Sequence, residues 1–191
     1  IDFFHVGDYH NASHIYHIIM GEFELKRHIS ILKRDLQFLA TKALREIKFN
    51  ESIKIFTNEH QRSEVRRRAN NAKKWLKANE DNTEIERWRE QIYELREVTD
   101  PIYHRVEENT TYFVYMRELE ILVEHALHYS RFEVPINKSF VGQRNIERLQ
   151  GAVDRANEWM KSALNSTFNT PPWEDRETTS RDILRVYKEL T

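Results

Sequence analysis

The fold is decided by residues 58–105, whose sequence is NEHQRSEVRRRANNAKKWLKANEDNTEIERWREQIYELREVTDPIYHR. Apolar residues recur there every three or four positions, which places them on one face of a helix. A short acidic turn at residues 77–82 interrupts the pattern, so the stretch predicts two amphipathic helices. Each helix carries a tryptophan on its apolar stripe and needs a partner to cover it. The two stripes are Val65, Ala69, Ala72, Trp75 and Leu76, then Ile85, Trp88, Ile92, Leu95 and Ile102.

Capping residues predict where these two helices begin and end. Thr57 or Asn58 is suited to cap the first helix, because short polar side chains accept hydrogen bonds from the first amides. Thr83 followed by Glu86 forms the pattern of a capping box for the second. Pro101 lacks a backbone donor, so we expect it to kink or end the second helix near Asp100.

The rest of the chain shows the same helical rhythm. A long helix is expected from Glu22 to about Lys48, and residues 50–56 are expected to be a break. Further helices are predicted from Asn109, over residues 146–163 and from about Thr179, with loops at 130–140 and 169–177. The stripe of the helix from Asn109 contains Phe113, Met116, Leu119, Val123 and Ala126.

These patterns predict an all-α fold, a helical bundle of about six amphipathic helices that includes a three-helix bundle. The partner of the two opening stripes is the long helix from Glu22. Residues 1–20 show no clear period, so they are interpreted as a linker or docking segment, with a short extended piece at Phe3–Val6. Residues 21–191 are predicted to form the helical domain.

Composition narrows the functional classes. The formal net charge of −1 argues against a dedicated nucleic-acid binder, which normally has a basic excess. The absence of cysteine excludes disulfides and thiolate metal sites. No apolar run is long enough to span a bilayer. There is no glycine-rich phosphate loop and no recognised nucleophile motif, so no catalytic or cofactor-binding residue is predicted, and the chain is not expected to be an enzyme.

Five Asn-x-Ser/Thr sequons suggest passage through the secretory pathway, where such asparagines receive glycans on exposed loops or helix ends. Four of them fall where loops or helix ends are predicted, and Asn11 is the exception. The alternative is that an asparagine-rich sequence produces sequons by chance. The candidate glycosylation sites are Asn11, Asn50, Asn109, Asn137 and Asn165.

Histidines offer an alternative function, a helical-bundle metal-binding protein or enzyme. His5, His10, His14 and His17 lie close together near the start of the sequence, with spacings that could gather imidazoles on a helix. The competing interpretation is a set of solvated histidines. Glu124-His125-x-x-His128 has the wrong order and spacing for a metalloprotease motif, and no di-iron motif is present, so no metal ligand is assigned.

A basic face is predicted on the first of the two opening helices. Its candidate partner-binding residues are Arg66, Arg67, Lys73 and Lys74, which could attract phosphate or an acidic protein. A weaker version of this idea is a scaffold or tether that uses the basic helix. The competing interpretation is a solvated face whose charges pair with the acid-rich helix at residues 84–97.

Three segments together resemble a known family. Residues 72–81 (AKKWLKANED) and 94–102 (ELREVTDPI) are similar to the C-terminal helical subdomain of the 70-kDa heat-shock chaperone superfamily, in its Trp-Leu helix, its acidic turn and its Pro-Ile landmark. Residues 146–160 (IERLQGAVDRANEWM) resemble the next helix of the large-chaperone branch. Order and spacing hold from about Leu25 to Leu190, and the strong motifs cover about a third of that range.

The resemblance implies a function that the periodicity does not. Within this branch, the sequons select the ER-lumenal relatives, the 170-kDa glucose-regulated or hypoxia-up-regulated chaperones, in a fungal version. Such a domain holds unfolded polypeptides and forms an arm of a nucleotide exchange factor for the resident 70-kDa heat-shock chaperone of the endoplasmic reticulum. The resemblance also implies a fragment of a longer chain, in which ATP binds a separate N-terminal domain and a β-sandwich follows it. The chain itself is expected to need no cofactor.

Overall fold

The computed structural model describes residues 6–134 and 142–191, with side chains for Tyr16 and residues 18–134 and 142–191. Every regular element in the described ranges is a helix, which confirms the all-α prediction. The chain divides into two compact units. The first comprises residues 1–54 and 58–101, and the second comprises residues 55–57 and 102–191.

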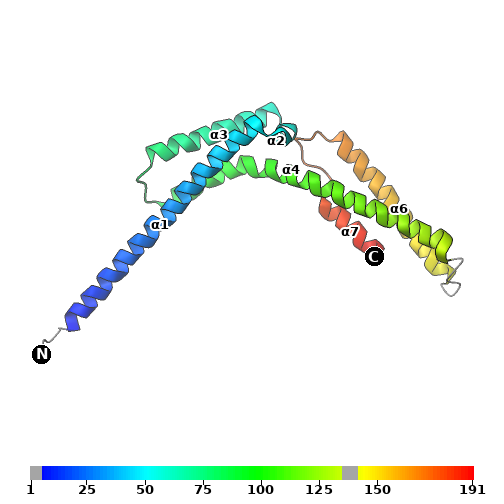
Figure 1. Cartoon of the computed structure of the whole chain (residues 1–191), viewed down its shortest axis with the longest axis horizontal. Coiled ribbons are helices and arrows are strands. Elements are labelled where there is room, and N and C mark those ends of the chain that lie inside the picture. Colours follow the sequence, from blue (N-terminus) through cyan, green and yellow to red (C-terminus); the bar gives the residue numbers. More distant parts are fainter. Residues whose placement is uncertain (1–5, 135–141) are drawn as a thin grey trace. The chain divides into compact units, whose positions relative to one another are not determined.

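The first unit contains α1 (Val6–Phe49), α2 (Glu51–Ile55, whose last residue is assigned to the other unit), α3 (Glu59–Ala78) and the first part of α4 (Ile85–His128). Helices α1, α3 and the first part of α4 lie side by side (Figure 1) and share a core. The fully buried members include Leu36, Ala40, Val65, Ala69, Trp88 and Leu95. The expected three-helix bundle is thus formed by the stripes that the sequence predicted.

Two tryptophans link α3 to α4 in this core. The rings of Trp75 and Trp88 meet edge to face, with centroids 4.8 Å apart. Trp88 is fully buried and its indole nitrogen donates to the carbonyl oxygen of Asn82 at 3.1 Å, whereas Trp75 is half-buried. The acidic turn between the helices is tied back to α1 by an ion pair from Lys33 to Glu80 at 2.7 Å.

The N-terminus of α3 begins as predicted. Asn58 is its N-cap: the side-chain oxygen accepts from the amide of Gln61 at 2.8 Å, and the Gln61 side chain accepts from the amide of Asn58 at 3.1 Å. The start of α4 was predicted wrongly. The helix begins at Ile85, and the Asn82 side chain accepts from the amide of Glu84 at 2.7 Å, so Asn82 and not Thr83 holds the preceding turn.

Three other boundaries differ from the predictions. Helix α1 begins at Val6 and not at Glu22, because a helix anchored by a packed segment extends at little cost per added residue. The expected break at residues 50–56 contains the short helix α2, whose Ile53 is buried. Helix α4 continues through Pro101 and through Asn109, so no new helix starts there.

The second unit contains the remainder of α4, the π-helix η1 (Tyr129–Glu133), α6 (Gln143–Asn169) and α7 (Ser180–Leu190). The expected loop from Ser130 therefore begins as helix, and residues 135–141 of it lie outside the described ranges. Helices α6 and α7 match their predictions, and Thr179 caps α7 in a box with Asp182.

The core of this unit corrects one predicted stripe. Tyr112 is fully buried, whereas Phe113 is 40% exposed, so the stripe of α4 is Tyr112, Met116, Leu119 and Val123. The error came from choosing the more apolar of two adjacent aromatic residues. Tyr112 belongs inside because its hydroxyl has a buried partner: it accepts from the hydroxyl of Thr167 at 3.0 Å. Val153, Ala156, Met160, Ala163 and Ile183 complete the core.

Candidate polypeptide-binding surface

The N-terminal part of α1 presents large apolar side chains that are substantially exposed to solvent. We call residues 16–31 the uncovered stretch of α1. Figure 1 shows this part of the helix extending beyond the end of α3, its neighbour in the first unit. The apolar members are between 37% and 61% exposed: Tyr16, Ile18, Ile19, Met20, Phe23, Leu25 and Ile31. Large apolar side chains left exposed along one helical segment make that segment a candidate interaction site.

One member of the uncovered stretch, Leu25, continues the stripe that builds the core. Leu25 stands 11 residues before Leu36, or about three helical turns, so the two lie on the same side of α1. Leu36 is fully buried against the bundle, while Leu25 is 37% exposed. The apolar stripe of α1 therefore extends towards the N-terminus beyond the part of the helix that is buried in the bundle.

Charge along the uncovered stretch has both signs. Glu22 and Glu24 precede Leu25, and Lys26 and Arg27 follow it. Neither sign dominates, so apolar area is the main feature that this surface offers to a partner.

The predicted basic face on α3 is largely neutralised by its own helix. Arg66 pairs with Glu59 at 3.1 Å, and Arg67 pairs with Glu64 at 2.5 Å. Both side chains are still exposed, but they share their charge with a neighbouring carboxylate. The acid-rich segment of α4 contributes longer contacts, since Glu94 and Glu97 lie 3.7 and 3.8 Å from Arg68.

Glu64 is the electrostatic centre of this face. Hydrogen bonds from Arg67 and Arg68 lower the pKa of its carboxyl group from 4.5 to about 2. The remaining candidates, Lys73 and Lys74, are adjacent to each other about two turns further along the same helix, and Lys74 is exposed. The structure thus leaves a smaller basic surface than the sequence suggested.

The sequons lie in different environments. Asn50 is exposed between α1 and α2, and Asn165 is exposed in the last turns of α6. Asn109 was predicted at a helix end, but it is half-buried in the interior of α4. The side chain of Asn11 and the whole of Asn137 lie outside the described residues.

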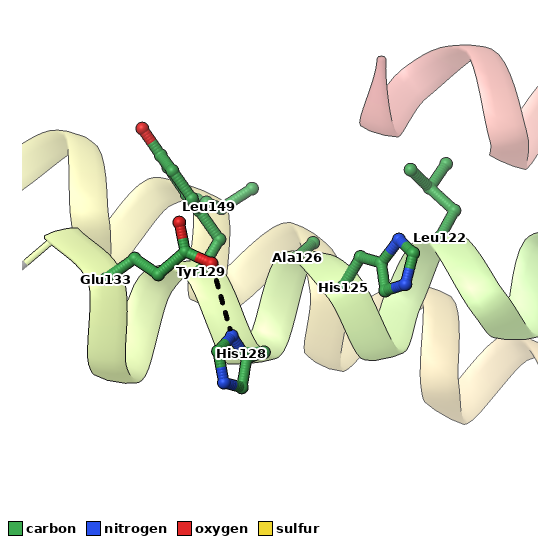
Figure 2. Close-up of a pocket in the computed structure, with 7 residues that line it drawn as sticks. All are labelled: Leu122, His125, Ala126, His128, Tyr129, Glu133 and Leu149. Carbon is green, nitrogen blue, oxygen red and sulfur yellow. Dashed lines mark ion pairs between the residues drawn. The ribbon is translucent and has the colours of Figure 1, made fainter.

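A cleft of about 620 Å³ opens beside the C-terminal end of α4 and the π-helix. Figure 2 shows its lining: Leu122, His125, Ala126, His128, Tyr129, Glu133 and Leu149. His128 and Glu133 face each other across the π-turn, with Nδ1 and Oε1 3.4 Å apart. The wall is mostly apolar, and none of the seven lining residues is a serine, cysteine or lysine nucleophile. This arrangement can bind a side chain or small molecule, but it contains no nucleophile–base pair.

The metal-binding alternative gains no support in the described part of the chain. No group of three or more His, Asp or Glu residues is close enough there to hold an ion. Among the described residues, Glu133 is the one carboxylate that lines the cleft together with His125 and His128, and these three side chains do not converge on a common point that could hold an ion. The side chains of His5, His10, His14 and His17 lie outside the described residues, so that N-terminal cluster stays a prediction.

The comparisons with known proteins leave the family unassigned: no protein family, curated protein or solved structure matches the chain. None of the described helices is long and apolar enough to cross a membrane. The functional argument therefore depends on the surfaces described above and on the residues that carry the chaperone resemblance.

Proposed function

We propose that the chain is a polypeptide-holding helical module of a chaperone in the lumen of the endoplasmic reticulum. In this role the uncovered stretch of α1 contacts apolar segments of unfolded clients. The module also serves as an arm that contacts the resident 70-kDa heat-shock chaperone and promotes nucleotide exchange there. ATP belongs to a separate domain of the longer protein, and this module performs no catalysis itself.

The uncovered stretch is the observation that carries the holding role. Its seven apolar side chains are at least 37% exposed along a helix whose other end is packed into a bundle. A rigid helix with uncovered aromatic and aliphatic side chains binds apolar peptide segments by removing both surfaces from water. The two signs of charge along the stretch are compatible with clients of varied composition.

The chaperone resemblance and the sequons support two parts of this proposal: location in the endoplasmic reticulum, and the 70-kDa heat-shock chaperone as partner. The motifs at residues 72–81 and 94–102 fall on α3, the following turn and α4, which pack with α1 in the first unit. Exposed sequons at Asn50 and Asn165 are suited to a protein that meets the glycosylation machinery.

The holding role is tested with two matched substitutions on α1. Phe23 is 61% exposed within the uncovered stretch, and Phe38 is 66% exposed on the same helix but outside it. Phe23→Asp should lose most of the chain's ability to suppress light scattering by a chemically denatured model substrate. Phe38→Asp should retain it. Equal suppression by both variants, or none by the parent chain, would exclude this surface.

The exchange-factor role needs a separate measurement. Immobilised nucleotide-binding domain of an ER 70-kDa chaperone should capture the chain, and the chain should speed the release of fluorescent ADP from that domain. A triple charge reversal at Arg66, Lys73 and Lys74 tests the remaining basic surface, because it should weaken capture if that face contacts the partner. Absence of capture by the parent chain would reject the arm role and leave the holding role to be judged by its own assay.

A further inference from the structure

The second unit contains a polar junction that ties the segment before α7 to the side of α4. We call it the α4–α7 junction. Glu108 on α4 accepts hydrogen bonds from both the amide and the hydroxyl of Ser180 at the start of α7. One turn earlier, Arg105 pairs with Asp175 at 3.1 Å. These contacts join positions about 70 residues apart in the sequence, so they form only when the unit has folded.

Asn109 takes part in this junction through its side chain. Its side-chain oxygen accepts a hydrogen bond from Nη2 of Arg176. The Arg176 guanidinium also lies over the rings of Tyr112 and Phe113, at 4.8 and 5.3 Å from their centroids. Arg176 is half-buried, and this partial burial lowers the pKa of its guanidinium from the ordinary value.

A sugar on Asn109 would displace these contacts. An N-linked glycan is bulky, and its first sugar needs open space around the amide nitrogen. Asn109 is half-buried, and Arg176 is fixed beside it by one hydrogen bond and two rings. Making room would push the half-buried Arg176 guanidinium away from its hydrogen-bond acceptor and both rings, so these contacts would be lost.

The sequons at Asn50 and Asn165 leave such room. At Asn50 only the side-chain oxygen is engaged, since it accepts from the amide of Ile53 at 3.3 Å. At Asn165 the oxygen again accepts, from the side-chain nitrogen of Asn169 at 3.3 Å. Both asparagines are exposed, and the nitrogen that would carry the sugar is not used in either contact.

We propose that the folded chain carries N-linked glycans at Asn50 and Asn165 and none at Asn109, whose side chain is reserved for the α4–α7 junction. The inference rests on the proposed passage through the secretory pathway. In the transfer, the amide nitrogen attacks the anomeric carbon of a lipid-diphosphate-linked oligosaccharide. A nitrogen–carbon bond forms, the carbon–oxygen bond to the diphosphate breaks, and the lipid diphosphate leaves while the nitrogen loses a proton. Chains that receive a sugar at Asn109 fail to close the junction and drop out of the folded population.

The test expresses the full 191-residue chain behind a signal peptide in a eukaryotic secretory host. Asn11 and Asn137 are replaced by glutamine so that three sequons remain. The soluble fraction should then show two glycan-dependent mobility steps on a gel. Asn50→Gln and Asn165→Gln should each remove one step, and Asn109→Gln should remove none. Glycosidase treatment in heavy-oxygen water should label positions 50 and 165 in peptide maps, because each released asparagine becomes a labelled aspartate.

Comparing the soluble and the aggregated protein tests whether a glycan on Asn109 prevents the junction from closing. Any glycan on Asn109 should be found in the aggregated, protease-sensitive material and be depleted from the soluble, protease-resistant protein. A soluble protein glycosylated at Asn109 would overturn the inference, and so would a soluble protein bare at Asn50 or Asn165. These outcomes are independent of client holding, because the holding assay can be run on unglycosylated protein.

Discussion

Replacement of Trp88 by alanine should destabilise the first unit more than any other single truncation in its core. Trp88 is fully buried, and truncating a buried large aromatic to alanine costs about 3–5 kcal/mol through lost burial and the cavity that remains. Its edge-to-face contact with Trp75 contributes about 0.5–1.5 kcal/mol beyond burial. Its indole hydrogen bond to Asn82 contributes about 1 kcal/mol.

These contributions place Trp88→Ala near the top of the range, at about 5 kcal/mol. Trp88→Phe keeps an aromatic ring but loses the hydrogen bond, so we expect the free energy of unfolding to fall by about 2 kcal/mol. Tyr93→Ala is the matched control, because Tyr93 is on the same helix and is 70% exposed. Its effect should stay within about 0.5 kcal/mol, as is usual for surface positions.

Urea unfolding followed by far-ultraviolet circular dichroism measures these differences. Separate transitions for the two units would be informative, since only the one that reports the first unit should move. A loss below about 1 kcal/mol for Trp88→Ala would refute the reasoning, because no well-packed buried tryptophan is truncated at so little cost. It would mean that the bundle of α1, α3 and α4 does not bury this ring in solution.

Three further outcomes follow from the structure. Tyr112→Phe should destabilise the second unit by about 1–2 kcal/mol in urea melts, because the buried hydroxyl of Thr167 loses its acceptor; Tyr112→Leu, which also removes the ring, should cost more. Glu64→Gln should lower stability at neutral pH. Because the folded pKa of Glu64 is about 2 against an ordinary 4.5, that deficit should be full above 4.5 and shrink as the pH falls towards 2; a pH-independent deficit in thermal melts would contradict the assignment. Ser180→Ala should cost about 1–2 kcal/mol and speed amide hydrogen exchange at the start of α7, because Glu108 loses a hydroxyl donor, whereas a variant with unchanged exchange would show that the junction is not formed.

Much of the fold could be predicted from apolar spacing alone. Periodicity located the stripes of α3 and α6 because each has one clear apolar face, and local chemistry located the Asn58 cap. Helix ends without such signals were predicted poorly. Pro101 and Asn109 both resemble boundaries, yet α4 passes through them, since tertiary packing outweighs a local preference of this size.

The surfaces were harder to predict, because they depend on which residues meet across the fold. Asn109 looked like a helix-end sequon until its contact with Arg176, 67 residues away, was known. The basic face looked open until Arg66 and Arg67 were seen to pair within α3. Within the uncovered stretch of α1, residues 16–20 were assigned to a linker, because the histidine-rich sequence before Gly21 shows no clear helical period, whereas the helix from Glu22 onward was predicted.

The π-helix after α4 sets the direction in which Val134 points. The amide of Val134 bonds to the carbonyl oxygen of Tyr129, five positions back, so this turn holds one residue more than an α-turn. Each residue advances an α-helix by about 100°. Deleting one residue from 129–133 would therefore restore α-helical hydrogen bonding and rotate Val134 away from the interior, where it is 98% hidden. The number of residues at 129–133 therefore matters as much as their identity, because an insertion or deletion there would change which side chain points into the core.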